Sequence, residues 1–254
     1  MVGGVDLSTW VASIFLLSLR TAPLFMFAPP FTLTRVPRLF LALLGIGLAI
    51  GLAGASPEHA LVQDLSAATL VIGGARELML GLIPVLVLNL MFAALYVAGR
   101  TLDIQSGFGL ALLIDPATRG QTPLVGTLLA YLAGAMFFAM NGHHEMLRFF
   151  AASLEVVPLG AAHAAAGFEA LSAYIFVIFL IGLGVAGAAI LVLFVADIVI
   201  ALLSRTVPQM NALILGIQVK AALLLITLPV VASVSGVMLA QMVTTALRAM
   251  ARMV

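Results

Sequence analysis

Residues 99–123 of this 254-residue chain read GRTLDIQSGFGLALLIDPATRGQTP, and they interrupt a sequence that otherwise consists of long apolar runs. Irregular backbone cannot lie against lipid, because its N–H and C=O groups would find no hydrogen-bonding partners there. We therefore expect this segment to be solvated or enclosed by protein. Phe108, which stands between Gly107 and Gly109, is the side chain expected to line or block a passage.

The composition is that of an integral membrane protein. Apolar residues make up 64% of the chain and charged residues 8%, and the mean hydropathy is +1.27. The net charge of +1 and the scattered arginines argue against nucleic acid as a partner. The absence of cysteine excludes a disulfide framework, a thiolate zinc site and a cysteine nucleophile.

Six apolar stretches follow one another, at about residues 10–31, 39–55, 65–98, 124–140, 171–203 and 212–246. The third, fifth and sixth are longer than about 30 residues, whereas about 20 residues span a bilayer as a helix. They must kink, split into hairpins or extend beyond the bilayer, and Pro84 and Pro229 are natural kink points. We predict an all-α, membrane-associated fold of long kinked helical hairpins, in a single domain over residues 1–254.

Five ionisable residues lie inside these apolar stretches, where an unpaired charge costs about 3 kcal/mol: Arg20, Arg76, Glu77, Asp197 and Lys220. Adjacent helical residues project about 100° apart, so Arg76 and Glu77 need different partners. Asp197 and Lys220 flank the turn at 205–211 and can pair across a hairpin. Pairing with neighbouring helices or subunits is the favoured interpretation of these charges, and a proton or ion relay is the alternative.

Two motifs that suggest chemistry have simpler explanations. The sequence GLGVAG at 182–187 matches a dinucleotide-binding pattern, but it lies in an apolar helix and not in a βαβ unit. It favours close helix packing, as do Gly47 and Gly51. The run at 143–145, His-His-Glu, lacks metal-ligand spacing and suits a surface or a helix cap. We expect no enzyme activity, no cofactor and no metal.

Several motifs together resemble the FliR family, the flagellar type III export gate component whose injectisome counterparts are the SctT proteins. The resemblance runs nearly end to end. Two positions depart from the family pattern: Ser106 replaces a frequent methionine, and Gln218 replaces a frequent proline. The matching stretches are Arg20 to Pro37, Ala75-Arg76-Glu77 with Gly81, Ala98 to Gly109 with Asp115-Pro116, Asn141 to His144 with Ser153 and Pro158, and Ser204 to Asn211 with Asp197 and Lys220.

The resemblance implies a FliR-like subunit that joins FliP-like and FliQ-like subunits around an export channel in the bacterial inner membrane. FlhB-like and FlhA-like components act beside this assembly, and unfolded flagellar proteins are its cargo. A loop at this position in the family is thought to plug the closed channel. The implied plug residues are Asp103, Gln105, Ser106, Gly107, Phe108, Gly109, Asp115 and Pro116, and the buried charges or subunit contacts are Arg76, Glu77, Asp197, Arg205, Gln209, Asn211 and Lys220.

Three alternatives remain open at this point. The chain could belong to a virulence injectisome of the same family instead of a flagellum. It could be a proton-coupled small-solute transporter, with Arg76, Glu77, Asp197 and Lys220 as a relay. It could also be a scaffold without a role in the pore.

Overall fold

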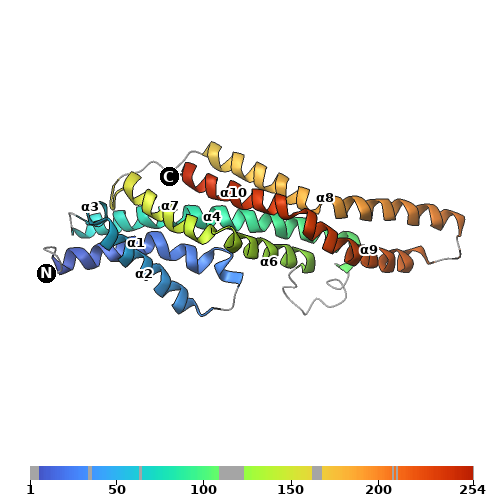
Figure 1. Ribbon diagram of the computed structural model, residues 1–254, viewed down its shortest axis with the longest axis horizontal. Coiled ribbons are helices and arrows are strands. Elements are labelled where there is room, and N and C mark those ends of the chain that lie inside the picture. Colours follow the sequence, from blue (N-terminus) through green and yellow to red (C-terminus); the bar gives the residue numbers. More distant parts are fainter. Residues whose placement is uncertain are drawn as a thin grey trace. The chain divides into compact units, whose positions relative to one another are not determined.

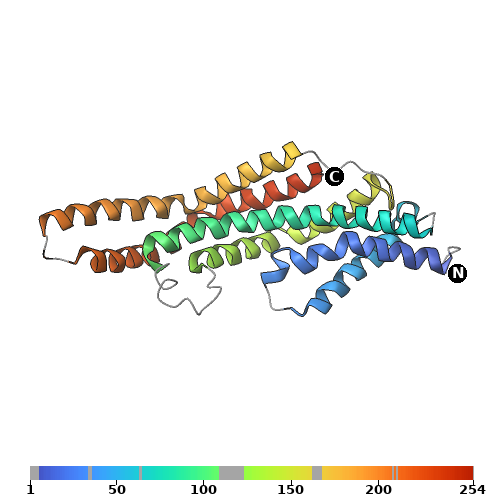
Figure 2. The same cartoon turned by 180° about the vertical axis from the view of Figure 1, so that it is seen from behind.

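The computed structural model describes residues 6–33, 36–62, 65–108, 123–161, 168–207, 209 and 211–253. All regular elements in these ranges are helices, as Figures 1 and 2 show, which confirms the all-α prediction. The chain divides into two compact units, and four of its helices contribute residues to both. The first unit comprises Met1–Leu90, Phe137–Ile175 and Thr245–Val254, and the second comprises Met91–Met136 and Phe176–Thr244.

The first unit is built on α1 (Leu7–Phe27), which packs against α2 (Arg38–Ala55). The short helices η1 (Phe31–Leu33) and α3 (Pro57–Ala60) follow α1 and α2, and α7 (Gly142–Val156) adds a third wall. Apolar side chains from α1, α2 and α7 and from the segments that flank α3 and α7 form its core. These core residues are Leu16, Leu17, Ala49, Ala53, Ala60, Val62, Leu154 and Leu159.

A glycine sets the separation of α1 and α2. A Cβ atom at Gly45 would collide with the backbone of Ala22, so only glycine permits this approach. The Thr21 hydroxyl donates a hydrogen bond to the Gly45 carbonyl at 2.8 Å, which ties the two helices at the same level. By contrast, a Cβ atom at Gly47 or Gly51 would meet no described atom within 4 Å. The expected close packing in α2 is therefore made by Gly45, which projects about 160° away from Gly47 and about 120° away from Gly51 around the helix axis.

The second unit contains α9 (Ala212–Val234), most of α6 (Leu124–Ala139) and of α8 (Phe168–Thr206), the C-terminal part of α4 (Ala67–Ser106) and the N-terminal half of α10 (Gly236–Met253). In both ribbon views α9 folds back along the C-terminal half of α8 to make a hairpin (Figures 1 and 2). A Cβ atom at Gly182 would lie 2.9 Å from the Ala94 Cβ atom, which confirms close α8–α4 packing at that glycine.

The long helices differ from the expected kinked hairpins in where they break. α4 has 40 residues and runs through Pro84 without interruption, which makes it about 60 Å long against a hydrocarbon core of about 30 Å. The sixth apolar stretch breaks at Ser235, between α9 and α10 (Gly236–Met253), although Pro229 lies inside α9. A serine–glycine pair is a known site of helix breaks, because glycine has low helix propensity.

Five described helices are long and apolar enough to cross a membrane: α1, α2, α4, α8 and α9. A sixth span results if α6 and α7 together form one broken span. Many of their large apolar side chains are exposed, including Phe176, Leu180 and Phe194 of α8. Such faces are suited to lipid or to the apolar faces of other subunits.

Candidate functional site

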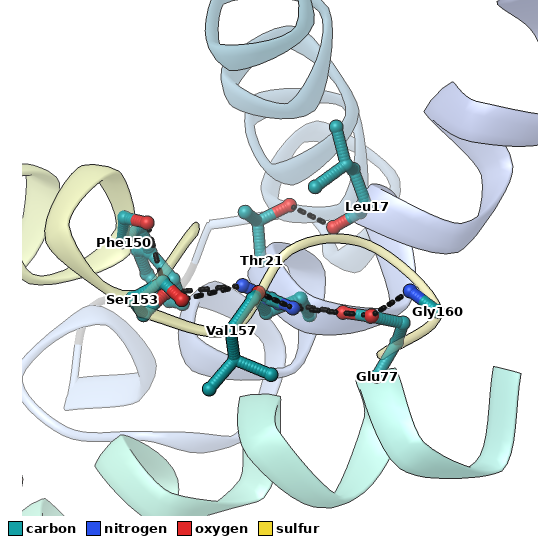
Figure 3. A network of polar contacts seen from close by, with 8 residues as sticks. Leu17, Thr21, Glu77, Phe150, Ser153, Val157 and Gly160 are labelled. Atoms are coloured by element: carbon teal, nitrogen blue, oxygen red, sulfur yellow. Dashed lines mark hydrogen bonds and ion pairs between the residues drawn. The ribbon is translucent and has the colours of Figure 1, made fainter. Parts of the chain in front are cut away.

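The most completely buried charged groups of the described residues lie where α1 meets α4, and Figure 3 shows them. The Arg20 Nε atom lies 2.5 Å from Oε2 of Glu77, and Nη2 lies 3.1 Å from Oε1. Both side chains are only 1% exposed. The pairing is bidentate, which is the geometry that a planar guanidinium forms best with a carboxylate. Arg20 therefore has the partner that its position inside an apolar helix requires.

The remaining groups of this pair bind the end of α7 and the turn that follows it. Arg20 donates to the Ser153 carbonyl at 3.1 Å and to the Val157 carbonyl at 3.0 Å. The Gly160 N–H donates to Oε1 of Glu77 at 3.2 Å. We call these five residues the Arg20 junction (Figure 3). It joins α1, α4 and α7, and its guanidinium charge lies at the C-terminal end of α7, where the helix dipole favours a cation.

Gly81 allows the Arg20 junction to form. It lies one turn after Glu77, on the same face of α4, and a Cβ atom there would collide with the Arg20 carbonyl and lie 2.8 Å from the Leu19 carbonyl. The absence of a side chain lets the α1 backbone come close enough for Arg20 and Glu77 to meet. This close approach explains why a glycine, Gly81, follows Arg76 and Glu77 in the motif.

Arg76 points elsewhere, as the helical geometry of adjacent residues predicts. Its side chain is exposed, and its Nη1 atom donates to the Gly160 carbonyl at 3.4 Å. Glu77 and Arg76 therefore have different partners, although both touch the turn at Gly160.

The predicted plug segment begins later than its sequence suggests. Asp103, Gln105 and Ser106 belong to the last turns of α4 and are not part of a loop. Helix α4 ends at Ser106, and Gly107 follows with φ +88°, the left-handed conformation that favours glycine after a helix. Its N–H donates to the Ile104 carbonyl at 3.2 Å. The remaining plug candidates Gly109, Asp115 and Pro116 lie outside the described residues.

Asp103 connects the two ends of the segment that separates α4 from α6. Its Oδ1 atom accepts a hydrogen bond from the Val125 N–H at 3.3 Å, in the first turn of α6. Nearby, a Cβ atom at Gly99 would collide with the backbone of Gly126, so the two helices touch through glycines. Asp103 is 5% exposed, and its Oδ2 atom has no hydrogen-bonding partner among the described residues. We call Asp103, Val125, Gly99 and Gly126 the loop base.

The hairpin of α8 and α9 holds the second predicted charge pair. The Lys220 Nζ atom lies 2.9 Å from Oδ1 of Asp197, with exposed side-chain fractions of 19% and 48%. This confirms that the two residues pair across the hairpin. Asn211 accepts a hydrogen bond from the Ile214 N–H at 3.3 Å and so caps α9. Arg205 and Gln209 are exposed at the hairpin tip.

The described residues offer structural contacts and no metal centre. No three His, Asp or Glu side chains within the described ranges gather closely enough to hold a metal ion. His143 and His144 lie in the first turn of α7, with ring centroids 4.2 Å apart, and His144 is exposed. The site consists of two helix junctions and one ion pair.

Comparison with known families decides the assignment. The family described as bacterial export proteins, family 1, matches residues 11–246. The chain belongs to this family. The match covers every long helix, including both residues of the Arg20–Glu77 pair and both residues of the Asp197–Lys220 pair.

Three relatives of this chain carry either a flagellar name or the name of a Yop translocation protein. The chain is 31% identical to Flagellar biosynthetic protein FliR of Bacillus subtilis over 63% of each chain. It is 26% identical to the protein of the same name from Pectobacterium carotovorum, over 88% of this chain and 85% of that one. It is 28% identical to Yop proteins translocation protein T of Yersinia pestis, over 63% and 62% respectively. The alignments with the Bacillus and Yersinia proteins thus cover less than two thirds of those relatives. None of these relatives supports the alternative of a small-solute transporter.

Sequence reasoning assigned no partner to Glu77, although it identified both Arg20 and Glu77 as charges within apolar stretches. It named Ser153 only as part of a matching motif, and it overlooked Val157 and Gly160, because these residues take part through backbone groups that every residue has. The charges themselves could have suggested the pair, because Arg20 in the first apolar stretch and Glu77 in the third have opposite signs and each needs a partner.

Proposed function

We propose that the chain is a core subunit of a flagellar type III export gate in the bacterial inner membrane. The observation that carries this proposal is the family match over residues 11–246, together with relatives named Flagellar biosynthetic protein FliR. The long helices add support. α4 and α8 are about twice as long as a bilayer requires, so parts of them must lie against protein or in water.

The partners we propose are FliP-like and FliQ-like gate subunits, with FlhB-like and FlhA-like export components beside them. Residues 1–254 act as one export-gate domain in this assembly, and unfolded flagellar proteins are the cargo. The exposed apolar side chains of α8 and α9 are compatible with a role within a larger complex, because any part of these faces that lies outside the lipid needs an apolar partner. Arg205 and Gln209, exposed at the hairpin tip, are available for subunit contacts.

We further propose that the segment from Gly107 to Pro116 obstructs the closed channel, with Phe108 as the blocking side chain. The loop base supports this role. Asp103 binds the first turn of α6 and Gly99 touches Gly126, so the two ends of the segment are held together. A segment with fixed ends can change its conformation without separating α4 from α6.

The experiment that tests the function is deletion of the gene in its own bacterium, followed by analysis of the proteins in the culture medium. Loss of hook and filament proteins, restored by the wild-type gene, is the expected result. Loss of virulence effectors with normal flagellar export would instead assign the chain to an injectisome, which relatives such as the Yersinia protein make the second candidate. A stable, active monomer that does not co-purify with FliP-like and FliQ-like proteins would contradict the proposal.

A further inference from the structure

We propose that Arg76 and an apolar groove along α4 bind one anionic phospholipid, with the phosphate on the guanidinium and an acyl chain in the groove. This site shares no residue with the loop base. It lies wholly within the first compact unit.

The charge of Arg76 is not neutralised by the described part of the chain. The adjacent carboxylate, Glu77, is bound by Arg20 and faces away. The ion pairs among the described residues join Arg20 to Glu77, Arg148 to Glu145 and Lys220 to Asp197. The Gly160 carbonyl, 3.4 Å from Arg76, carries no net charge. An exposed cation on a membrane-spanning helix therefore remains available to an anion.

The groove begins at this cation. It has a volume of about 540 Å³ and is lined mainly by apolar side chains, including Met79, Ile83 and Leu86. With Arg76 these residues are spaced three, four and three apart, so they form one stripe on α4. Asn89, at the far end, donates to the Phe27 carbonyl at 3.1 Å.

The length of the groove suits an extended hydrocarbon chain. From Arg76 to Asn89 the helix rises about 20 Å, and one leaflet of the hydrocarbon core is about 15 Å thick. A molecule with an anion at one end and an extended hydrocarbon chain matches both the charge and the shape. A phospholipid has this chemistry and is abundant around a membrane helix.

The test uses the full chain reconstituted into nanodiscs that contain equal amounts of phosphatidylglycerol and phosphatidylcholine. The chain is then extracted in mild detergent, and the retained lipids are counted by mass spectrometry. We expect about one phosphatidylglycerol per chain, retained with about fivefold preference over phosphatidylcholine, since one basic residue contributes attraction of that size. Arg76→Gln should abolish the preference, whereas Arg76→Lys should keep most of it.

Two further variants separate this site from general effects. Arg148→Gln removes an equal charge from an exposed position on α7 and should leave the preference unchanged. Ile83→Trp fills the groove but keeps Arg76, so it should lower retention of lipid severalfold even if Arg76→Gln fails to fold. Equal retention of the two lipids by the wild type would overturn the proposal, as would equal effects of Arg76→Gln and Arg148→Gln.

A cysteine variant tests whether a second copy of the chain occupies the groove instead. The natural chain has no cysteine, so disulfide-linked dimers of Ile83→Cys would form only through this position. Such dimers without bound lipid would also overturn the proposal.

Discussion

Both carboxylate oxygens of Glu77 accept hydrogen bonds from the Arg20 guanidinium, and Oε1 also accepts one from the Gly160 N–H, while the two charged side chains are only 1% exposed. Removing one partner of a buried pair leaves the other charge uncompensated, which costs about 3–5 kcal/mol. We expect Glu77→Ala to lower the free energy of unfolding of the purified chain in detergent by this amount. The measurement is denaturant unfolding followed by circular dichroism.

Glu145 provides the matched control for this residue. It also pairs with an arginine, Arg148, at 2.7 Å, but the two side chains are 45% and 77% exposed. Exposed pairs contribute less than about 1 kcal/mol, so Glu145→Ala should change stability little. A double variant, Arg20→Met with Glu77→Leu, should recover part of the loss, because it leaves no buried charge unpaired. Equal destabilisation by Glu77→Ala and Glu145→Ala would show that the junction is not the cause.

Helix α2 offers a comparison of two glycines only two residues apart. A Cβ atom at Gly45 would collide with Ala22, whereas one at Gly47 would meet no described atom within 4 Å. Gly45→Ala should therefore destabilise the α1–α2 pair by about 1–3 kcal/mol through overpacking. Gly47→Ala should be neutral or stabilising by up to about 1 kcal/mol, since alanine has the higher helix propensity. Thermal unfolding of both variants distinguishes these outcomes, and similar effects would mean that α1 and α2 are not in close contact.

The ion pair between Asp197 and Lys220 joins the two helices of the α8–α9 hairpin, and exchanging its charges tests its role. Asp197→Lys or Lys220→Asp alone places two like charges about 3 Å apart in an apolar setting, and each should reduce export of cargo at least tenfold. The double exchange, Asp197→Lys with Lys220→Asp, restores opposite charges and should recover most of the export. Secretion assays of the three variants in the native bacterium measure this. Failure of the double exchange would favour the ion-relay interpretation, in which the position of each charge matters.

For the helices, the sequence predicted their positions along the chain better than the contacts between them. The Asp197–Lys220 pair was predictable because both residues flank one turn, so chain connectivity brings them together. Arg20 and Glu77 are 57 residues apart, and no local pattern shows which two helices will pack. The end of α4 was also placed too early. Polar residues after Gly99 suggested a loop, yet they are compatible with a helix, and the conformation that ends α4 belongs to Gly107.

For the whole molecule, the plug proposal makes a prediction about permeability. Phe108→Ala, or deletion of 107–109, should increase leakage of small ions through the assembled gate, because the obstruction loses its bulk. Membrane conductance or the sensitivity of cells to small toxic solutes measures the leak. Phe15→Ala is the control, since Phe15 is an exposed phenylalanine of α1. Unchanged leakage in a correctly assembled Phe108 variant would show that this side chain does not seal the channel.

The Arg20 junction also dictates an order of events during synthesis. Arg20 leaves the ribosome first, Glu77 follows 57 residues later, and the Ser153 carbonyl arrives 133 residues after Arg20. Until Ser153 and Val157 have been made, Arg20 and Glu77 can pair, but the guanidinium lacks the two carbonyl oxygens that complete its hydrogen bonds. The packing of the N-terminal helices is therefore completed only when α7 has been translated. A nascent chain that stalls before that point has an arginine with unfilled hydrogen bonds inside an apolar helix bundle.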